Sequence, residues 1–172
     1  LEKVKETPRP AQEPVTAQKP ANMPLQKIPI PQVRNFVGRR EEIKTCDTWL
    51  GSNSPMLLIC GIAGQGKTAL CSEITQRWEA KGVHFIYTRM TSWGTETSFF
   101  GDVAVSLKAM SRPMLSELIS EKGTLGWEEF LSVMMQENRY KPFCLIVDDL
   151  HEQRDPESTR KLMDALVQLG HG

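Results

Sequence analysis

A phosphate-binding loop is the strongest chemical signal in the sequence. Residues 61–68 read GIAGQGKT and match the pattern G-x-x-x-x-G-K-[ST] at every fixed position. Glycines lack the Cβ atom that would keep backbone N–H groups away from a phosphate. The helix expected after the loop adds the positive end of its dipole. We therefore predict that the loop binds the phosphates of a nucleotide, and a glycine-rich turn that binds nothing is the weaker alternative.

Two side chains of this loop are predicted to contact the charged groups of the nucleotide and its metal ion. Lys67 is placed to reach the β- and γ-phosphate oxygens, and the Thr68 hydroxyl is placed to ligate Mg²⁺. The residues predicted to bind the phosphates are Gly61, Ile62, Ala63, Gly64, Gln65, Gly66, Lys67, Thr68 and Ala69.

A pair of carboxylates supplies the partner that such a loop requires. The apolar run 143–147 ends in Asp148 and Asp149, which is typical of a buried strand with acidic residues at its carboxyl end. We assign Asp148 to Mg²⁺ and Asp149 to the orientation of the attacking water, with Glu152 as a competing candidate for the second role. The predicted catalytic residues are thus Lys67, Asp148 and Asp149. Two aspartates that merely begin a turn are the alternative.

The elements that must position these residues alternate between strands and helices. Apolar spacing predicts helices over 39–50, from the loop to Gly82, over 95–110, after Pro113, from Trp127, and over 155–170. Buried strands are predicted at 56–60, 83–88 and 143–147. This alternation predicts an α/β fold, a parallel sheet flanked by helices in three layers, with ligands at the carboxyl ends of the strands.

Composition narrows the class of protein. The chain has 172 residues, 40% of them hydrophobic, and a formal net charge of zero, so no overall field favours nucleic acid. The four cysteines form no C-x-x-C pair, which favours a reducing, cytoplasmic setting without disulfides or zinc. No apolar run approaches the ~18 residues of a membrane span, so we expect no membrane partner.

The first 34 residues differ from the rest. They hold seven of the eleven prolines, with no glycine and no aromatic residue. Such a segment buries too little apolar surface to offset its ordering entropy, so we predict a disordered linker at 1–34 and a nucleotide-binding domain at 35–172. A proline-rich recognition peptide or a basic arm is the alternative for this segment.

Three motifs together resemble the STAND class of AAA-like P-loop ATPases, which act as nucleotide-operated switches. They are the sequence FVGR at 36–39, the phosphate loop, and LIVDD at 145–149. The chain is most similar to archaeal members in which such an ATPase follows a winged-helix domain. The resemblance implies ATP as the nucleotide, and it implies an adenine pocket lined by Phe36, Val37 and Gly38. Arg40 stands where the class usually has Glu.

The same resemblance implies structural elements of the ATPase domain that residues 1–172 do not include. In the class, a strand carrying a polar γ-phosphate sensor inserts between the phosphate-loop strand and the carboxylate strand. We therefore expect the N-terminal portion of the ATPase domain, truncated before the sensor strand. We expect the chain alone to be marginally folded and to hydrolyse ATP poorly, and the full-length protein to be a slow ATP hydrolase.

A switch read by flanking domains is the favoured function. The expected partners are ATP or ADP, a winged-helix DNA-binding domain upstream, a repeat or sensor domain downstream, and a nucleotide-dependent oligomer. Slow hydrolysis suits a switch because the ATP state must persist. An AAA-type motor or loader acting on DNA or protein is the second hypothesis, and a small-molecule kinase built on the same loop is a third. The last hypothesis is an interaction module with a degenerate nucleotide site.

Overall fold

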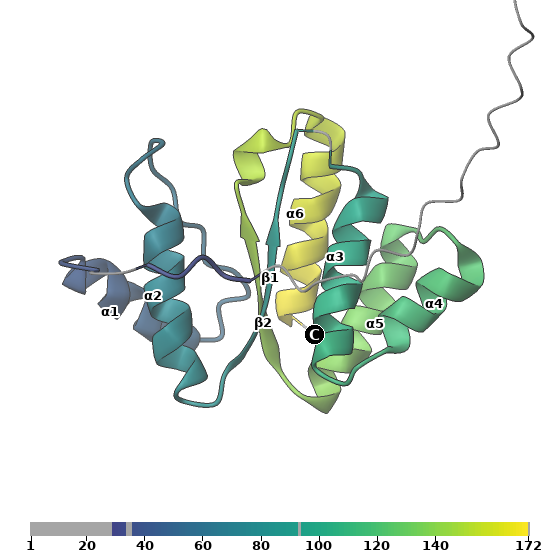
Figure 1. Cartoon of the computed structure of the whole chain (residues 1–172), viewed down its shortest axis with the longest axis horizontal. Helices are drawn as coiled ribbons and strands as arrows, with labels where there is room; N and C mark the ends of the chain where they lie inside the picture. The colour runs from purple at the N-terminus through teal and green to yellow at the C-terminus, as the bar shows by residue number, and fades with distance from the viewer. Residues whose placement is uncertain (1–28, 34–35, 93, 172) are drawn as a thin grey trace, which may run out of the picture.

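A two-stranded parallel sheet separates two groups of helices in this computed structural model, which describes residues 29–33, 36–92 and 94–171 (Figure 1). The elements in chain order are α1 (Arg40–Leu50), α2 (Lys67–Glu79), β1 (His84–Arg89), α3 (Glu96–Ala109), α4 (Met114–Lys122), α5 (Trp127–Tyr140), β2 (Phe143–Asp148), a short 3₁₀ helix η1 (Leu150–Glu152), and α6 (Pro156–His171).

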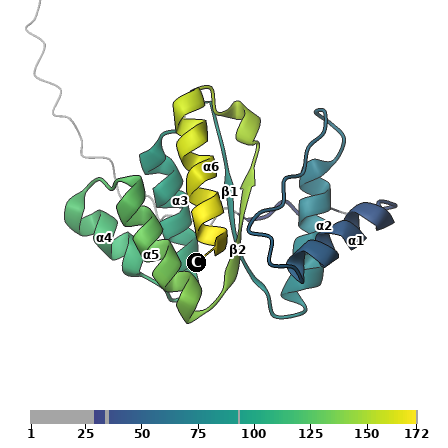
Figure 2. The same ribbon diagram turned by 180° about the vertical axis from the view of Figure 1, so that it is seen from behind.

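The sheet sets the layers. β1 and β2 pair in parallel from His84 opposite Phe143 to Arg89 opposite Asp148. Helices α1 and α2 lie on one side of the sheet, and α3 to α6 lie on the other (Figures 1 and 2). Successive side chains of a strand point to opposite faces, so each strand serves both groups of helices. The predicted α/β fold with helices on both faces is confirmed.

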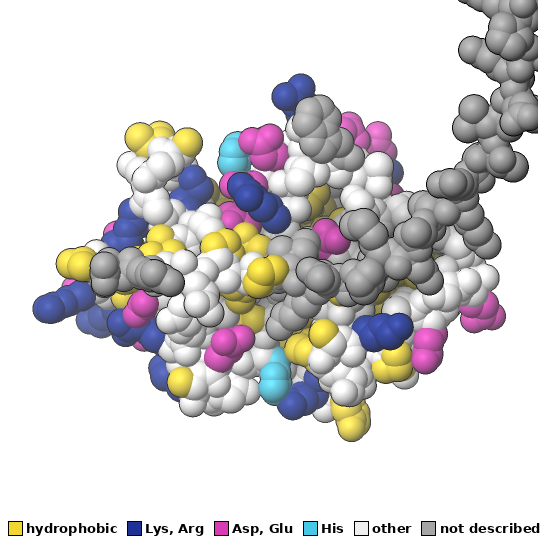
Figure 3. Space-filling view, in the orientation of Figure 1, with side chains coloured by type: hydrophobic (Ala, Val, Ile, Leu, Met, Phe, Trp, Pro, Cys, Tyr) yellow, Lys and Arg dark blue, Asp and Glu magenta, His cyan; other side chains and the backbone are white. Residues whose placement is uncertain are grey.

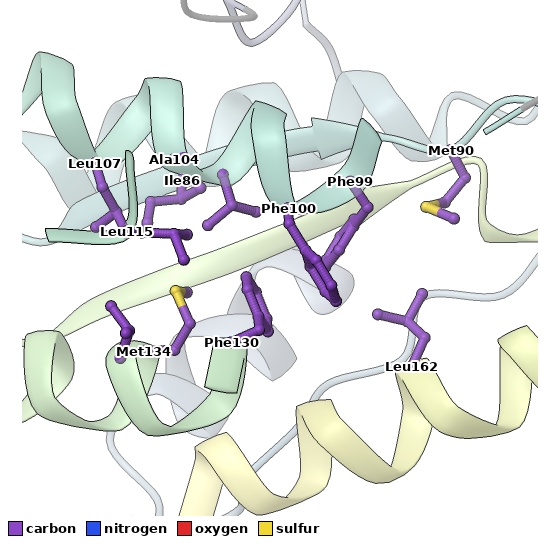
Figure 4. Close-up of a cluster of buried hydrophobic side chains, with 12 residues drawn as sticks. Ile86, Met90, Phe99, Phe100, Ala104, Leu107, Leu115, Phe130, Met134 and Leu162 are labelled. Atoms are coloured by element: carbon purple, nitrogen blue, oxygen red, sulfur yellow. The ribbon is translucent and has the colours of Figure 1, made fainter. Parts of the chain in front are cut away.

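An aromatic cluster fills the face covered by α3, α5 and α6. Phe100 and Phe130 stack with ring centroids 4.4 Å apart, and Phe99 and Trp127 pack around them. Ile86 of β1 and Leu162 of α6 belong to the same buried cluster (Figure 4). Burial of this apolar surface ties the three helices to the sheet.

The opposite face joins α1 and α2 to β1 through a column of rings. Trp78 of α2 stacks between Trp49 of α1 and Phe85 of β1, with centroid separations of 6.1 and 5.9 Å. The Trp78 indole Nε1 donates to Asp47 Oδ1 at 2.6 Å. These contacts hold α2 against the sheet, and α2 carries the phosphate loop at its N-terminal end.

The buried strand predicted at 56–60 is wrong. This segment has no strand assignment, and 58% of the Leu58 side chain is exposed. A strand needs a neighbouring backbone about 5 Å away to pair its N–H and C=O groups. In the described part of the chain β2 pairs with β1 alone. Leu57, Ile59 and the facing side of β2 instead line a cavity of about 750 Å³.

The other predicted elements are confirmed with shifts of one or two residues at most of their ends. Helix α6 begins at Pro156, as predicted, and the Asp155 carboxylate accepts the backbone N–H of Ser158 at 3.0 Å. Most of the predicted linker lies outside the described residues, but Ile30 packs against the α1 and α2 core. Among the described helices, none has both the length and the apolar character needed to span a bilayer.

Helix α6 also fixes the start of the segment 56–60. A Cβ atom added to Gly170 would overlap the Pro55 backbone, whereas one added to Gly101 of α3 would meet open space. We expect Gly170→Ala to lower the free energy of unfolding by about 1–3 kcal/mol, because the backbone must move to admit the methyl group. Urea denaturation followed by circular dichroism measures this change.

Gly101→Ala is the matched control for that experiment. It replaces another helical glycine without steric overlap, so we expect it to raise the free energy of unfolding by about 0.5–1 kcal/mol. Equal effects of the two substitutions would contradict the close approach of Pro55 to α6.

Candidate functional site

The phosphate loop lies directly before the first turn of α2. Gly64 and Gly66 have φ angles of +80° and +75°, in the left-handed region that a Cβ atom disfavours. Gly66 is the N-cap of α2, and no side chain in the described part of the chain caps this helix end. The first backbone N–H groups of α2 have no acceptor within the helix, so this end of α2 suits an anion.

The loop is held in shape by its own side chains. Lys67 Nζ donates to the carbonyls of Gly61 and Ile62 at 2.9 and 3.2 Å. Gln65 Oε1 accepts the backbone N–H of Ile62 at 3.2 Å, and a Cβ atom on Gly61 would come within 2.6 Å of this oxygen. Gly61 therefore leaves room for the end of the Gln65 side chain, which a Cβ atom would displace.

The two halves of the candidate site meet at Asp148. Thr68 Oγ1 donates to Asp148 Oδ2 at 2.8 Å. The other carboxylate oxygen, Oδ1, accepts the backbone N–H of Asp149 at 2.9 Å. Asp148 is the last residue of β2 and is half-buried. The structure thus brings together the hydroxyl and the carboxylate that the sequence predicts as ligands of Mg²⁺.

This pair fits Mg²⁺ as a site shared with phosphate oxygens. In the described ranges, no three His, Cys, Asp or Glu side chains gather to form a metal cage. Mg²⁺ commonly binds through one or two carboxylates together with substrate phosphates and water. One hydroxyl and one carboxylate beside a phosphate loop meet that requirement, and both ligands are oxygens.

Tyr87 is a third donor to the carboxylate of Asp148. Its side chain is buried in the sheet, and its hydroxyl donates to Asp148 Oδ2 at 2.9 Å. Burial and then the hydrogen bond to Asp148 raise the pKa of the Tyr87 hydroxyl, so this group keeps its proton. Sequence analysis missed Tyr87, although aligning the carboxyl ends of the two predicted strands would have placed it near Asp148.

Asp149 is paired with a cation rather than free. It has a left-handed backbone with φ of 53°, and Arg89 Nε donates to its Oδ2 at 2.6 Å. The register sets Arg89 opposite Asp148, so both strand ends deliver charged groups to the same edge of the sheet. Glu152, the competing candidate for the role of Asp149, lies in η1 with its carboxylate 3.4 Å from His151 Nε2.

The segment predicted to line an adenine pocket lies beside α1. Phe36 packs half-buried against the α1 and α2 core, Val37 is 87% exposed, and Gly38 has a φ of +84°. Arg39 follows in a left-handed conformation, and its guanidinium donates to the Gln65 carbonyl of the phosphate loop. Sequence analysis gave Arg39 no role, yet its side chain connects the 36–39 segment to the phosphate loop.

A cavity of about 750 Å³ joins the phosphate loop to the end of β2, and its lining does not include residues 36–39. Its polar end is lined by Gly61, Lys67, Asp148 and Asp149, and the rest is largely apolar. Cys71 also lines the cavity, and burial followed by the charge of Asp148 raises its pKa to about 11. The Cys71 thiol therefore stays protonated at neutral pH and is a poor metal ligand.

Charged side chains gather at the same end of the molecule. Figure 3 shows basic, acidic and histidine side chains beside one another above the sheet, between the phosphate loop and the top of α6. In Figure 1 this is the end toward which both strands run and where α2 begins. The location agrees with the rule that open parallel sheets bind ligands at the carboxyl ends of their strands.

Comparison with known families agrees with this geometry. Residues 35–171, well over half of the chain, match the family described as AAA ATPase domain. Comparisons with curated proteins and with solved structures give no match. The phosphate loop, Thr68 and Asp148 all lie within the matched residues, and the family binds nucleotide. The chain belongs to the AAA ATPase domain family and is a nucleotide-binding ATPase domain.

Proposed function

We propose that the chain binds ATP together with Mg²⁺ and acts as a nucleotide-operated switch of the STAND type. The observation that carries this proposal is the 2.8 Å hydrogen bond between Thr68 and Asp148. It brings a phosphate-loop hydroxyl and a strand-end carboxylate to one point, as a shared magnesium site requires. We also propose an affinity with the archaeal members of that class, on the basis of the three motifs alone.

Each polar group of the site has a proposed task. The loop N–H groups and Lys67 Nζ hold the phosphates, and Lys67 exchanges its present bonds to the Gly61 and Ile62 carbonyls for phosphate oxygens. Thr68 and Asp148 hold Mg²⁺. When bound, the metal ion neutralises phosphate charge and favours displacement at the γ-phosphate.

The state of Asp149 supports slow hydrolysis. Arg89 donates to Oδ2 of Asp149 at 2.6 Å, which weakens this carboxylate as a base and leaves only Oδ1 to orient the attacking water. Hydrolysis is therefore expected to be slow, and the ATP-bound state persists. A switch needs such a persistent state, whereas a rapidly cycling motor does not. Nothing comparable favours a small-molecule kinase.

The adenine and the partners complete the proposal. We propose that the base contacts Phe36, Val37 and Gly38. The Val37 side chain is exposed, and two residues later Arg39 donates to the phosphate loop. We also propose that residues 1–34 link the domain at 35–172 to an upstream winged-helix domain, and that a downstream repeat or sensor domain or an oligomer reads the nucleotide state. The cysteines, all four free in the structure, agree with a cytoplasmic location.

Lys67→Ala tests the phosphate contacts. We expect the affinity for a fluorescent ATP analogue to fall on the order of 100-fold, because a charge-assisted hydrogen bond to phosphate is lost. Equilibrium titration monitored by fluorescence anisotropy measures this change. Lys81→Ala, which removes an exposed ammonium just beyond the other end of α2, serves as the control and should bind normally. Unchanged affinity in the Lys67 variant would refute the assignment.

Asp148→Ala tests the metal site. We expect ATP binding to remain measurable and to lose most of its dependence on Mg²⁺, because the protein then contributes one metal ligand fewer. Isothermal titration of ATP with and without Mg²⁺ measures the difference. Asp164→Ala, an exposed position on α6, should retain the dependence. A Mg²⁺ effect as large in the Asp148 variant as in the parent chain would place the metal elsewhere.

Amide hydrogen exchange tests the switch itself. Exchange in the ATP–Mg²⁺ state should differ from exchange in the ADP state at the end of β1 and in η1, because Arg89 and Asp149 lie beside the proposed γ-phosphate position. Size-exclusion chromatography under the same conditions measures whether an oligomer forms in only one of the two nucleotide states. Identical exchange in both states would contradict the switch.

A further inference from the structure

The Asp148 carboxylate accepts hydrogen bonds from three donors, and one of them lies on the neighbouring strand. Thr68 and Tyr87 both donate to Oδ2, at 2.8 and 2.9 Å, and the Asp149 N–H donates to Oδ1 at 2.9 Å. Thr68 is itself a proposed metal ligand, and the Asp149 N–H belongs to the turn that follows β2. Tyr87 alone reaches the carboxylate from the neighbouring strand.

The sheet register explains how Tyr87 reaches Asp148. Tyr87 lies opposite Ile146, and Asp148 is the next residue of β2 on that face. A long aromatic side chain spans such a diagonal between neighbouring strands. The side chain is 2% exposed, so its hydroxyl is largely shielded from solvent water that could replace Asp148 as a partner.

Burial by itself does not account for the pairing. The hydroxyls of Thr88, the next residue of β1, and of Ser106 in α3 are buried with no hydrogen-bond partner among the described residues. Burial of a hydroxyl in this fold therefore does not by itself bring a protein partner to it. The Tyr87 hydroxyl, in contrast, is aimed at the one carboxylate that the proposed function assigns to the metal.

We propose that Tyr87 is a positioning residue that sets the Mg²⁺ affinity of the nucleotide site by fixing the Asp148 carboxylate. This inference rests on the proposed function. A carboxylate anchored only through its own turn can rotate about its terminal torsion, which is broad in aspartate. The Tyr87 hydroxyl restricts this rotation from outside the turn and leaves the phosphate loop itself untouched.

Tyr87→Phe removes the hydroxyl and keeps the ring. The Mg²⁺ concentration that gives half of the maximal increase in ATP affinity should rise on the order of tenfold, because a hydrogen bond to a charged group is lost. The affinity for ATP in excess EDTA should stay within about twofold, since the Tyr87 hydroxyl donates to Asp148 and not to the phosphate loop. Fluorescence anisotropy of a labelled ATP analogue over a Mg²⁺ series measures both quantities in the full chain.

Tyr140→Phe is the matched control, because it removes the hydroxyl of the other tyrosine, which is 85% exposed at the end of α5. It should behave as the parent chain does. Adding Tyr87→Phe to Asp148→Ala should cause no further change in the Mg²⁺ series, because Tyr87 acts through Asp148.

A second measurement keeps the Tyr87 hydroxyl and so does not depend on whether the Phe variant folds. Chains labelled with 3-fluorotyrosine have two fluorine resonances, and Tyr140→Phe leaves only that of Tyr87. Adding Mg²⁺ to the ATP-bound chain should shift the Tyr87 resonance and leave the Tyr140 resonance in place.

The outcomes separate this inference from the proposed function. A parent chain whose ATP affinity does not respond to Mg²⁺ would overturn the proposed function, and this inference with it. A parent chain that responds, with an unchanged Mg²⁺ series in Tyr87→Phe, would overturn the inference alone. Equal loss of ATP affinity with and without Mg²⁺ would assign Tyr87 a purely structural role and also overturn it.

Discussion

The hydrogen bond from Thr68 to Asp148 is the contact on which the candidate site depends. It joins residues 80 positions apart and spans from the first turn of α2 to the end of β2. Without it, the phosphate loop and the acidic strand end would be two separate features of the surface. The bond can form because the Trp49, Trp78 and Phe85 column holds α2 against the sheet. Apolar packing at one end of α2 thus positions the polar chemistry at the other.

The two faces of the sheet contribute differently. The α3, α5 and α6 side is a closed aromatic core in which Phe100, Phe130 and Leu162 are almost fully buried. The α1 and α2 side includes the 750 Å³ cavity, which runs from the phosphate loop along β2. Rigid packing on the first face holds β2 in place while the second face stays open to a ligand. The charged residues Arg89 and Asp149 lie where the open face meets the end of the sheet.

Much of this architecture could be predicted from residue spacing. Apolar periodicity predicted the helices and the strands β1 and β2, and the loop pattern together with the two aspartates predicted both halves of the site. The prediction of a strand at 56–60 was wrong because an apolar run reports hydrophobicity and not a pairing partner. Leu58 and Cys60 are exposed there, and the described chain offers no adjacent strand. Tyr87, Arg39 and Arg89 were missed because each acts through a residue distant in sequence.

By itself, the sequence determined the phosphate loop, its glycines, the Lys67 and Thr68 side chains, and the acidic end of an apolar strand. These features are local, since backbone freedom and side-chain chemistry at a fixed spacing are properties of a short segment. Only the tertiary structure decided that Tyr87 and Thr68 share one oxygen of Asp148, that Arg89 neutralises Asp149, and that Arg39 contacts the loop. These pairings follow from the parallel register of β1 and β2 and from the packing of α1 and α2. Hydrogen bonds form only over about 3 Å, a separation that the folded backbone sets and residue spacing does not.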